Sequence, residues 1–114
     1  MEQALRQAGC VGVEVGADGV IYARLDAAFP EFTVQPDGAR WRFALQWPVR
    51  ASEAQREGWA LLHPDAPLDV DLGETRMQFW GGVQDVPRWA DLAAAMVAQC
   101  IRWRRATRQG DEGM

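Results

Sequence analysis

The sequence predicts an α+β fold: an antiparallel sheet of about five to six strands, built from hairpins and covered on one face by a C-terminal amphipathic helix and a shorter middle helix. Short segments with apolar residues at every second position predict the strands. Turn-forming residues between them predict hairpin links, which make neighbouring strands antiparallel. A late segment with helical apolar spacing predicts the covering helix. The 114 residues suit one domain, which we expect at residues 1–108, with a disordered tail at residues 109–114.

The N-terminal segment predicts a short helix followed by a hairpin. Residues 2–8 are good helix formers, and Gly9 suits the left-handed position that follows a helix end. Residues 11–25 then alternate in hydrophobicity around Asp18-Gly19, a pair that tolerates the positive φ of a tight turn. We expect the first strand of this hairpin to place three valines on one face: Val11, Val13 and Val15.

The central segment contains the clearest strand pattern. A short strand at residues 32–35 is followed by the turn signal Pro36-Asp37-Gly38. A longer strand then begins at residue 41, and large apolar residues share one of its faces while polar or small residues take the other. Pro48 lacks the N–H that a ladder requires, so it marks a sheet edge or the exit of the strand. The residues on the core face are Trp41, Phe43, Leu45, Trp47 and Val49.

The middle of the chain predicts the shorter helix and a third hairpin. Ser52 and Gln55 have the spacing of a capping box, so we expect a helix at residues 53–62. Two segments of alternating hydrophobicity then flank Gly73-Glu74, which we expect to form the turn. The two strands are expected at residues 68–72 and 75–80.

The last helix is predicted to be the most regular element. Asp85 is placed to accept a hydrogen bond at its N-terminus, and Pro87 fits the first turn, where no N–H is needed. From residue 89 the apolar residues follow i, i+3, i+4 spacing, which predicts one face buried against the sheet. That face comprises Trp89, Leu92, Ala93, Met96, Val97, Cys100 and Ile101.

Charge is distributed unevenly along the chain. The net charge is -4; residues 1–86 hold 13 acidic residues and 7 arginines, and residues 87–114 hold 3 acidic residues and 5 arginines. An acidic body repels the phosphate backbone, which disfavours direct nucleic-acid binding, and it favours association with a basic protein. The C-terminal arginines fit cations that offset a helix dipole, with contact to an acidic partner as the alternative. They are Arg102, Arg104, Arg105 and Arg108.

Cysteine usage and hydropathy indicate the compartment. No segment approaches the roughly 20 apolar residues that span a bilayer, and the first residues lack signal-peptide character, so we expect a cytoplasmic protein without membrane contact. Cys10 and Cys100 lie in apolar segments outside any CxxC pair, so we expect two reduced, buried thiols.

Motifs for catalysis and cofactor binding are missing from the sequence. His63 is the only histidine, Ser52 is the only serine and there is no lysine, which removes most arrangements of a nucleophile and a base. The glycines between residues 9 and 19 match neither a dinucleotide-binding loop nor a phosphate-binding loop. We therefore expect no cofactor, no catalytic residue and a protein that is not an enzyme.

The acidic stretch His63–Glu74 is a weak candidate for a metal site. Asp69 and Asp71 are two residues apart on a predicted strand, so both carboxylates face the same way, with His63 nearby. The offsets of a calcium loop are missing, so we interpret the stretch as the solvated face of an edge strand. The alternative is a metal-dependent hydrolase or a small-ligand binder that uses this stretch. A further hypothesis is an apolar ligand pocket between Trp47, Trp59 and Trp80.

The tryptophans are the most unusual feature of the sequence, because six occur in a short chain. Trp41, Trp47 and Trp89 fall on predicted core faces. Trp80 falls on the outer face of its strand, and Trp103 lies among arginines near the end of the last helix. Tryptophan and arginine are enriched at protein–protein interfaces. We therefore predict these partner-binding residues: Trp59, Trp80, Arg102, Trp103 and Arg105.

These observations together favour a small acidic non-catalytic protein-binding module of the inhibitor, immunity, anti-defence or adaptor type, acting by surface complementarity. The expected order of elements is also similar to that of the small dimeric type III secretion chaperones, which run helix, strands, helix, strands, helix. That resemblance implies, as the alternative, a secretion-chaperone-like protein that forms a homodimer.

Overall fold

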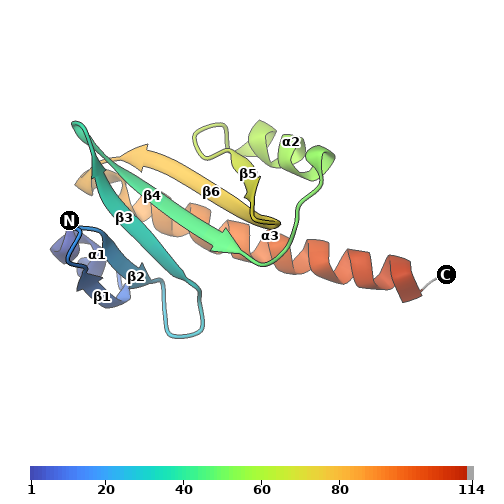
Figure 1. Cartoon of the computed structure of the whole chain (residues 1–114), viewed down its shortest axis with the longest axis horizontal. Coiled ribbons are helices and arrows are strands. Elements are labelled where there is room, and N and C mark those ends of the chain that lie inside the picture. The colour runs from blue at the N-terminus through green and yellow to red at the C-terminus, as the bar shows by residue number, and fades with distance from the viewer. Residues whose placement is uncertain (113–114) are drawn as a thin grey trace.

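In the computed structural model, which describes residues 1–112 and side chains to Thr107, a six-stranded antiparallel sheet forms one layer and three α-helices form the other (Figure 1). The helices are α1 (Glu2–Gln7), α2 (Glu53–Leu62) and α3 (Val86–Glu112), with a 3-10 turn η1 (Val83–Asp85) before the last. The strands are β1 (Val11–Val15), β2 (Ile21–Arg24), β3 (Glu31–Asp37), β4 (Arg40–Trp47), β5 (Leu68–Asp71) and β6 (Glu74–Gly81), in the sheet order β1-β2-β3-β4-β6-β5. The predicted fold class is confirmed.

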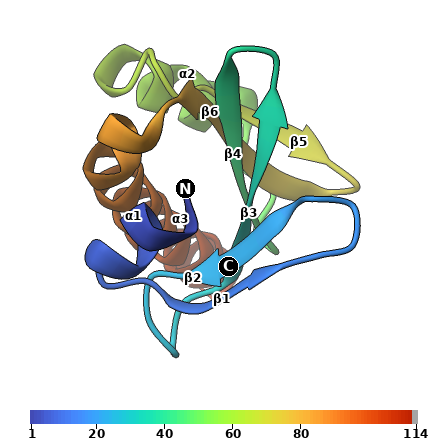
Figure 2. The same cartoon turned by 90° about the vertical axis from the view of Figure 1, so that its left-hand side faces the viewer.

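The three helices lie on the same side of the sheet, and its other face is left open (Figure 2). Helix α3 contacts β4 and β6, α2 contacts β5, and α1 contacts β1. The open face carries polar and charged side chains together with Trp80, which is half-buried. The molecule is therefore a two-layer domain with a buried face and a solvated face of the same sheet.

Helix α1 is short and ends in a hydrogen-bonded reversal of the chain. The N–H of Gly9 donates to the carbonyl of Arg6 at 3.0 Å, and the N–H of Cys10 donates to the carbonyl of Leu5 at 3.0 Å. This pair of bonds needs a left-handed residue after the helix, and Gly9 supplies it with φ of 93°. The reversal directs Leu5 and Cys10 into the core.

The first hairpin forms as predicted, but its first strand contains a bulge. The register between β1 and β2 shifts between Val11 and Glu14, and Gly12 has φ of 62°. Because a bulge interrupts the alternation of side chains, the prediction that three valines share one face is wrong for Val11. Val15 pairs with the buried Ile21 and Val13 packs against the core, whereas Val11 pairs with the exposed Arg24.

Strand β3 extends past the proline that was expected to start a turn. Pro36 pairs with Trp41 and Asp37 pairs with Arg40, so the loop between β3 and β4 is only Gly38 and Ala39. The pairing of β3 with β2 ends before Pro36, and a proline is tolerated where a neighbouring strand has ended. The turn lies two residues later than the proline suggested.

Strand β4 lies in the middle of the sheet between β3 and β6. Phe43 and Leu45, at its centre, are buried as predicted, and Trp41 and Trp47 are half-buried near its ends. The strand ends at Trp47, so Pro48 marks its exit.

The hairpin of β5 and β6 turns at Leu72 and Gly73, one residue earlier than predicted. Asp71 pairs with Glu74, and both loop residues have positive φ, 53° at Leu72 and 79° at Gly73. Leucine rarely adopts this conformation, so the sequence pattern favoured Gly73-Glu74. The Leu72 side chain is 92% exposed.

The chain between β4 and α2 is fastened to β6 by Thr75, the buried polar residue of the core layer. Its N–H donates to the carbonyl of Val49 at 3.0 Å, and its hydroxyl donates to the same carbonyl. The hydroxyl also accepts the N–H of Ala51 at 2.9 Å. These three bonds fix the start of α2 relative to the sheet.

Helix α3 covers the sheet with the predicted apolar face, and Trp89 lies at the centre of the core. The centroid of its ring lies 5.5 Å from the ring centroid of Phe32, 5.4 Å from that of Phe43 and 6.2 Å from that of Phe79. The predicted face is buried through Cys100, but Ile101 is partly exposed, because α3 runs beyond the sheet (Figure 1).

The two ends of α3 differ in detail from the sequence prediction. The Asp85 carboxylate accepts the N–H of Gly82 at 2.8 Å, so it closes η1, the turn that leads into α3. At the other end the helix continues to Glu112, within the segment 109–114 predicted as a tail. Residues 113–114 lie outside the described residues, and the predicted disorder stays a prediction.

Candidate partner-binding groove

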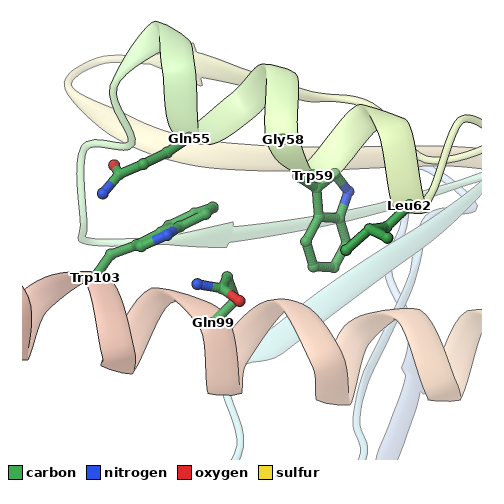
Figure 3. Close-up of a pocket in the computed structure, with 6 residues that line it drawn as sticks. All are labelled: Gln55, Gly58, Trp59, Leu62, Gln99 and Trp103. Atoms are coloured by element: carbon green, nitrogen blue, oxygen red, sulfur yellow. The ribbon is translucent and has the colours of Figure 1, made fainter.

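A groove of about 290 Å³ separates α2 from the C-terminal half of α3 (Figure 3). On α2 the lining side chains recur at i, i+3, i+4 and i+7, which places them on one face of the helix. On α3 they are one turn apart. The lining residues are Gln55, Gly58, Trp59 and Leu62 from α2, and Gln99 and Trp103 from α3.

The predicted capping box holds one end of the groove in place. The Ser52 hydroxyl accepts the N–H of Gln55 at 3.1 Å, and Oε1 of Gln55 accepts the N–H of Ser52 at 2.8 Å. The Gln55 side chain is therefore fixed at the first turn of α2, and its amide nitrogen remains for other contacts.

Trp59 forms a buried wall of the groove. Its indole N–H donates to the carbonyl of Ala66 at 2.8 Å, and its ring lies 4.2 Å from the ring of His63. Both contacts hold the indole in one orientation. Trp59, predicted as a partner-binding residue, is buried and offers the groove only part of its ring.

The wall formed by α3 combines an aromatic side chain with arginines. Trp103 is half-buried, and Arg102 donates to Oε1 of Gln99 at 2.6 Å. Arg104 donates to the carbonyl of Pro48 at 2.7 Å, which holds this part of α3 against the exit of β4. Arg105 is exposed. The side chain of Arg108, the last residue of the predicted basic cluster, lies outside the described residues.

An exposed leucine lines the groove at the C-terminal end of α2. Leu62 is 76% exposed, and Leu61, next to it in the sequence but outside the lining, is 86% exposed. Gly58, one turn before Leu62, faces open space, because a Cβ built there meets no atom within 4 Å. The groove is therefore shallow, apolar and accessible from this side.

Trp80 belongs to a different part of the surface. It lies on the open face of the sheet, where its indole N–H donates to Oδ2 of Asp37 at 2.7 Å and the Arg40 guanidinium lies 5.9 Å from its ring centroid. The structure thus brings Trp59, Trp103 and Arg102 together and separates them from Trp80. The hypothesis of a single pocket between Trp47, Trp59 and Trp80 is wrong for the same reason.

Three aspartates of the acidic stretch His63–Glu74 form ion pairs with arginines. Arg76 donates to both carboxylate oxygens of Asp69, at 3.0 and 2.6 Å, and lies 3.7 Å from Asp71. The two carboxylates do face the same way, as predicted, but both face an arginine. In the part of the chain that the structure describes, no three His, Cys, Asp or Glu side chains converge as a metal site would require.

Asp65 and His63, in the same stretch, also have partners in the fold. Arg88 donates to both carboxylate oxygens of Asp65 at 3.0 Å, and this hydrogen bonding lowers the pKa of that carboxyl group. His63 packs against Trp59 with the two ring planes tilted by 41°. These groups join the 63–67 loop to α3 and to α2.

The two cysteines are free and buried, as predicted. Burial raises the pKa of the Cys10 thiol, and it raises the pKa of the Cys100 thiol to about 11. Since the thiolate is the nucleophilic form, both side chains are poor nucleophiles at neutral pH.

Sequence reasoning missed four residues of the groove: Gln55 as a lining residue, Gly58, Leu62 and Gln99. Gln55 was assigned only to the capping box, and a glutamine on α3 carries no signal by itself. The one available signal was Gly58. A glycine inside a helix is destabilising, so its presence suggests a role in packing or in function.

The comparisons with known proteins give no family for this chain. No protein-family model matches it, and neither a curated protein nor a solved structure matches it significantly. Among the described residues, no helix combines the length and the apolar character that crossing a bilayer requires.

Proposed function

We propose that this protein is a non-catalytic protein-binding module that receives an apolar side chain of a partner protein in the groove between α2 and α3. The observation that carries the proposal is the combination of an open, mostly apolar groove with Leu62, a lining residue that is 76% exposed, and the exposed Leu61 next to it in the sequence. Soluble monomers rarely leave adjacent large apolar side chains in water beside a concave surface unless that surface binds something.

The groove, with a volume of about 290 Å³, offers room for an anchoring side chain of a partner. Interfaces gain most of their affinity from a few anchors seated in such pockets. Covering an exposed leucine contributes about 1.5–3 kcal/mol, so Leu62 and Trp103 around one anchor supply a substantial contact.

The placement of the reactive side chains supports a function without chemistry. Ser52 caps α2, His63 packs against Trp59, and both thiols are buried with raised pKa values. None of these groups lines the groove. Binding by surface complementarity is the role that remains for the residues that do.

A selection from a library of random linear peptides tests the proposal. The immobilised protein is compared with Gly58→Leu, which places a side chain in the open space of the groove and replaces glycine with a better helix former. Glu57→Leu is the matched control: it adds the same side chain to an exposed residue of α2 that does not line the groove.

We expect peptides that bind the wild type and the Glu57→Leu variant, and that lose affinity about tenfold or more for Gly58→Leu, which corresponds to roughly 1.4 kcal/mol. Far-ultraviolet circular dichroism and urea unfolding confirm that both variants fold. If the selected peptides bind Gly58→Leu as well as they bind the wild type, the groove is not the binding site and the proposal fails.

A further inference from the structure

We infer that the groove recognises an acidic segment of its partner: a polypeptide that presents a carboxylate beside the apolar side chain that enters the groove. The inference rests on the proposed function and specifies the chemistry of the partner. Its basis is that hydrogen-bond donors outnumber acceptors among the free polar groups of the lining, and that Arg102, which donates to the lining residue Gln99, places a cation beside the groove.

The two glutamines of the lining have the amide oxygen hydrogen-bonded and the amide nitrogen free. Oε1 of Gln55 accepts the N–H of Ser52, and Oε1 of Gln99 accepts a hydrogen bond from the Arg102 guanidinium. Each oxygen keeps one acceptor site while each NH₂ group keeps two donor hydrogens, so donors outnumber acceptors at both amides. Figure 3 shows both amide nitrogens turned toward the Trp103 ring.

The aromatic and charged groups beside these amides add further donors. The indole N–H of Trp103 and the guanidinium of Arg102 donate and never accept. An occupant that presented only donors would leave these groups unpaired, which costs free energy for each one that it buries. An occupant that presents carboxylate oxygens pairs with them.

Among the described residues, no charged side chain lines the groove itself, and the cation held beside it is the guanidinium of Arg102, which donates to the lining residue Gln99. From residue 92 to residue 107, α3 carries three arginines and no aspartate or glutamate. On α2 the two glutamates, Glu53 and Glu57, are exposed and, like the arginines, lie outside the lining. The net charge of the body favoured a basic partner, but the groups at the groove favour an acidic one, because short-range pairing acts through the nearest charges.

The peptide selection tests this inference separately from the proposed function. We expect the peptides that depend on the groove to share an aspartate or glutamate near a large apolar residue. Synthetic versions of these peptides are then compared with versions in which each acid is replaced by its amide. The amide versions should bind about tenfold or more weakly, because a hydrogen bond to a charged group contributes more than a neutral one.

A variant of the protein provides the reciprocal test. Gln99→Glu keeps an oxygen for Arg102 and replaces the free NH₂ group by a carboxylate oxygen, which repels an acidic segment. We expect this substitution to weaken the binding of the acidic peptides about tenfold or more, while the urea midpoint of unfolding stays near that of the wild type. Gln78→Glu, on the open face of the sheet, is the matched control and should leave the affinity unchanged.

The outcomes separate the two claims. Suppose that the peptides require the groove, but that their amide versions bind as tightly as the acidic ones or that the peptides bind Gln99→Glu as tightly as the wild type. Either result overturns the inference that the partner segment is acidic and leaves the proposed function standing. A selection that yields no peptide dependent on the groove overturns the proposed function itself.

Discussion

Replacing Thr75 by valine removes two of the three hydrogen bonds that join the loop before α2 to strand β6. Valine matches threonine in shape but lacks the hydroxyl, so the buried N–H of Ala51 loses its acceptor. The carbonyl of Val49 loses the hydroxyl donor but keeps the N–H of residue 75. The variant therefore isolates the two hydrogen bonds of a single oxygen atom.

The expected cost follows from these two bonds. An unsatisfied buried N–H costs about 1–3 kcal/mol, and an ordinary hydrogen bond contributes about 0.5–1.5 kcal/mol. We expect Thr75→Val to lower the free energy of unfolding by about 2–4 kcal/mol, a large part of the roughly 5–15 kcal/mol that stabilises a typical domain. Thr75→Ser keeps the hydroxyl and deletes one methyl group, which costs about 1 kcal/mol.

Urea unfolding, followed by circular dichroism and by tryptophan fluorescence, measures both variants. The midpoint should fall further for Thr75→Val than for Thr75→Ser, with an unchanged slope in each case. The opposite order would refute the reasoning, since it would mean that the methyl group of Thr75 matters more than its hydroxyl.

Three further perturbations have defined outcomes. Gly58→Ala should raise the free energy of unfolding by about 0.5–1 kcal/mol in the same assay, because its Cβ meets no atom and alanine favours a helix. Labelling with iodoacetamide at pH 8 should leave both cysteines unmodified in the folded protein and modify both in urea, because they are buried and the pKa of Cys100 is raised to about 11. Arg88→Ala should lower the free energy of unfolding at neutral pH by at most about 1 kcal/mol, because the pair with Asp65 is more than a third exposed. The pKa of Asp65 is lowered in the folded state, so this difference should be complete above about pH 5 and disappear as the pH falls through that lowered pKa; a difference that grows on acidification would contradict it.

Much of the fold was predictable because its strongest signals are local. The alternation along β4, the helical spacing from Trp89 to Cys100 and the capping box of Ser52 and Gln55 each depend on residues close together in the sequence. Such patterns state which face is apolar and where a helix begins. The order of elements then follows from the connecting turns.

The errors arose where the outcome depends on distant neighbours or on an unusual backbone. Ile101 continues the apolar spacing of α3, but the spacing does not reveal where the sheet beneath the helix ends. Leu72 adopts a left-handed conformation that leucine disfavours, so the turn was placed one residue late. In β1 a single glycine at position 12 accompanies a bulge that simple alternation does not predict.

The groove could be predicted only in part. Trp103 and Arg102 stand out by residue type, and the sequence indicates them as contact residues. Gln55 and Gln99 are 44 positions apart, and each is an ordinary polar residue of a helix. Only the packing of α2 beside α3 makes them opposite walls of one site and shows which atom of each amide is still unpaired.

The bulge in β1 also affects how copies of this protein meet. Strand β1 is at one edge of the sheet, where unpaired N–H and C=O groups can recruit a strand from another molecule and begin aggregation. The irregular segment around Gly12 breaks the straight row of these groups, and natural sheets use such bulges to block edge-to-edge pairing. Because Leu61 and Leu62 already expose apolar surface, the bulge also keeps the edge of β1 from adding a second surface through which copies of the molecule could associate.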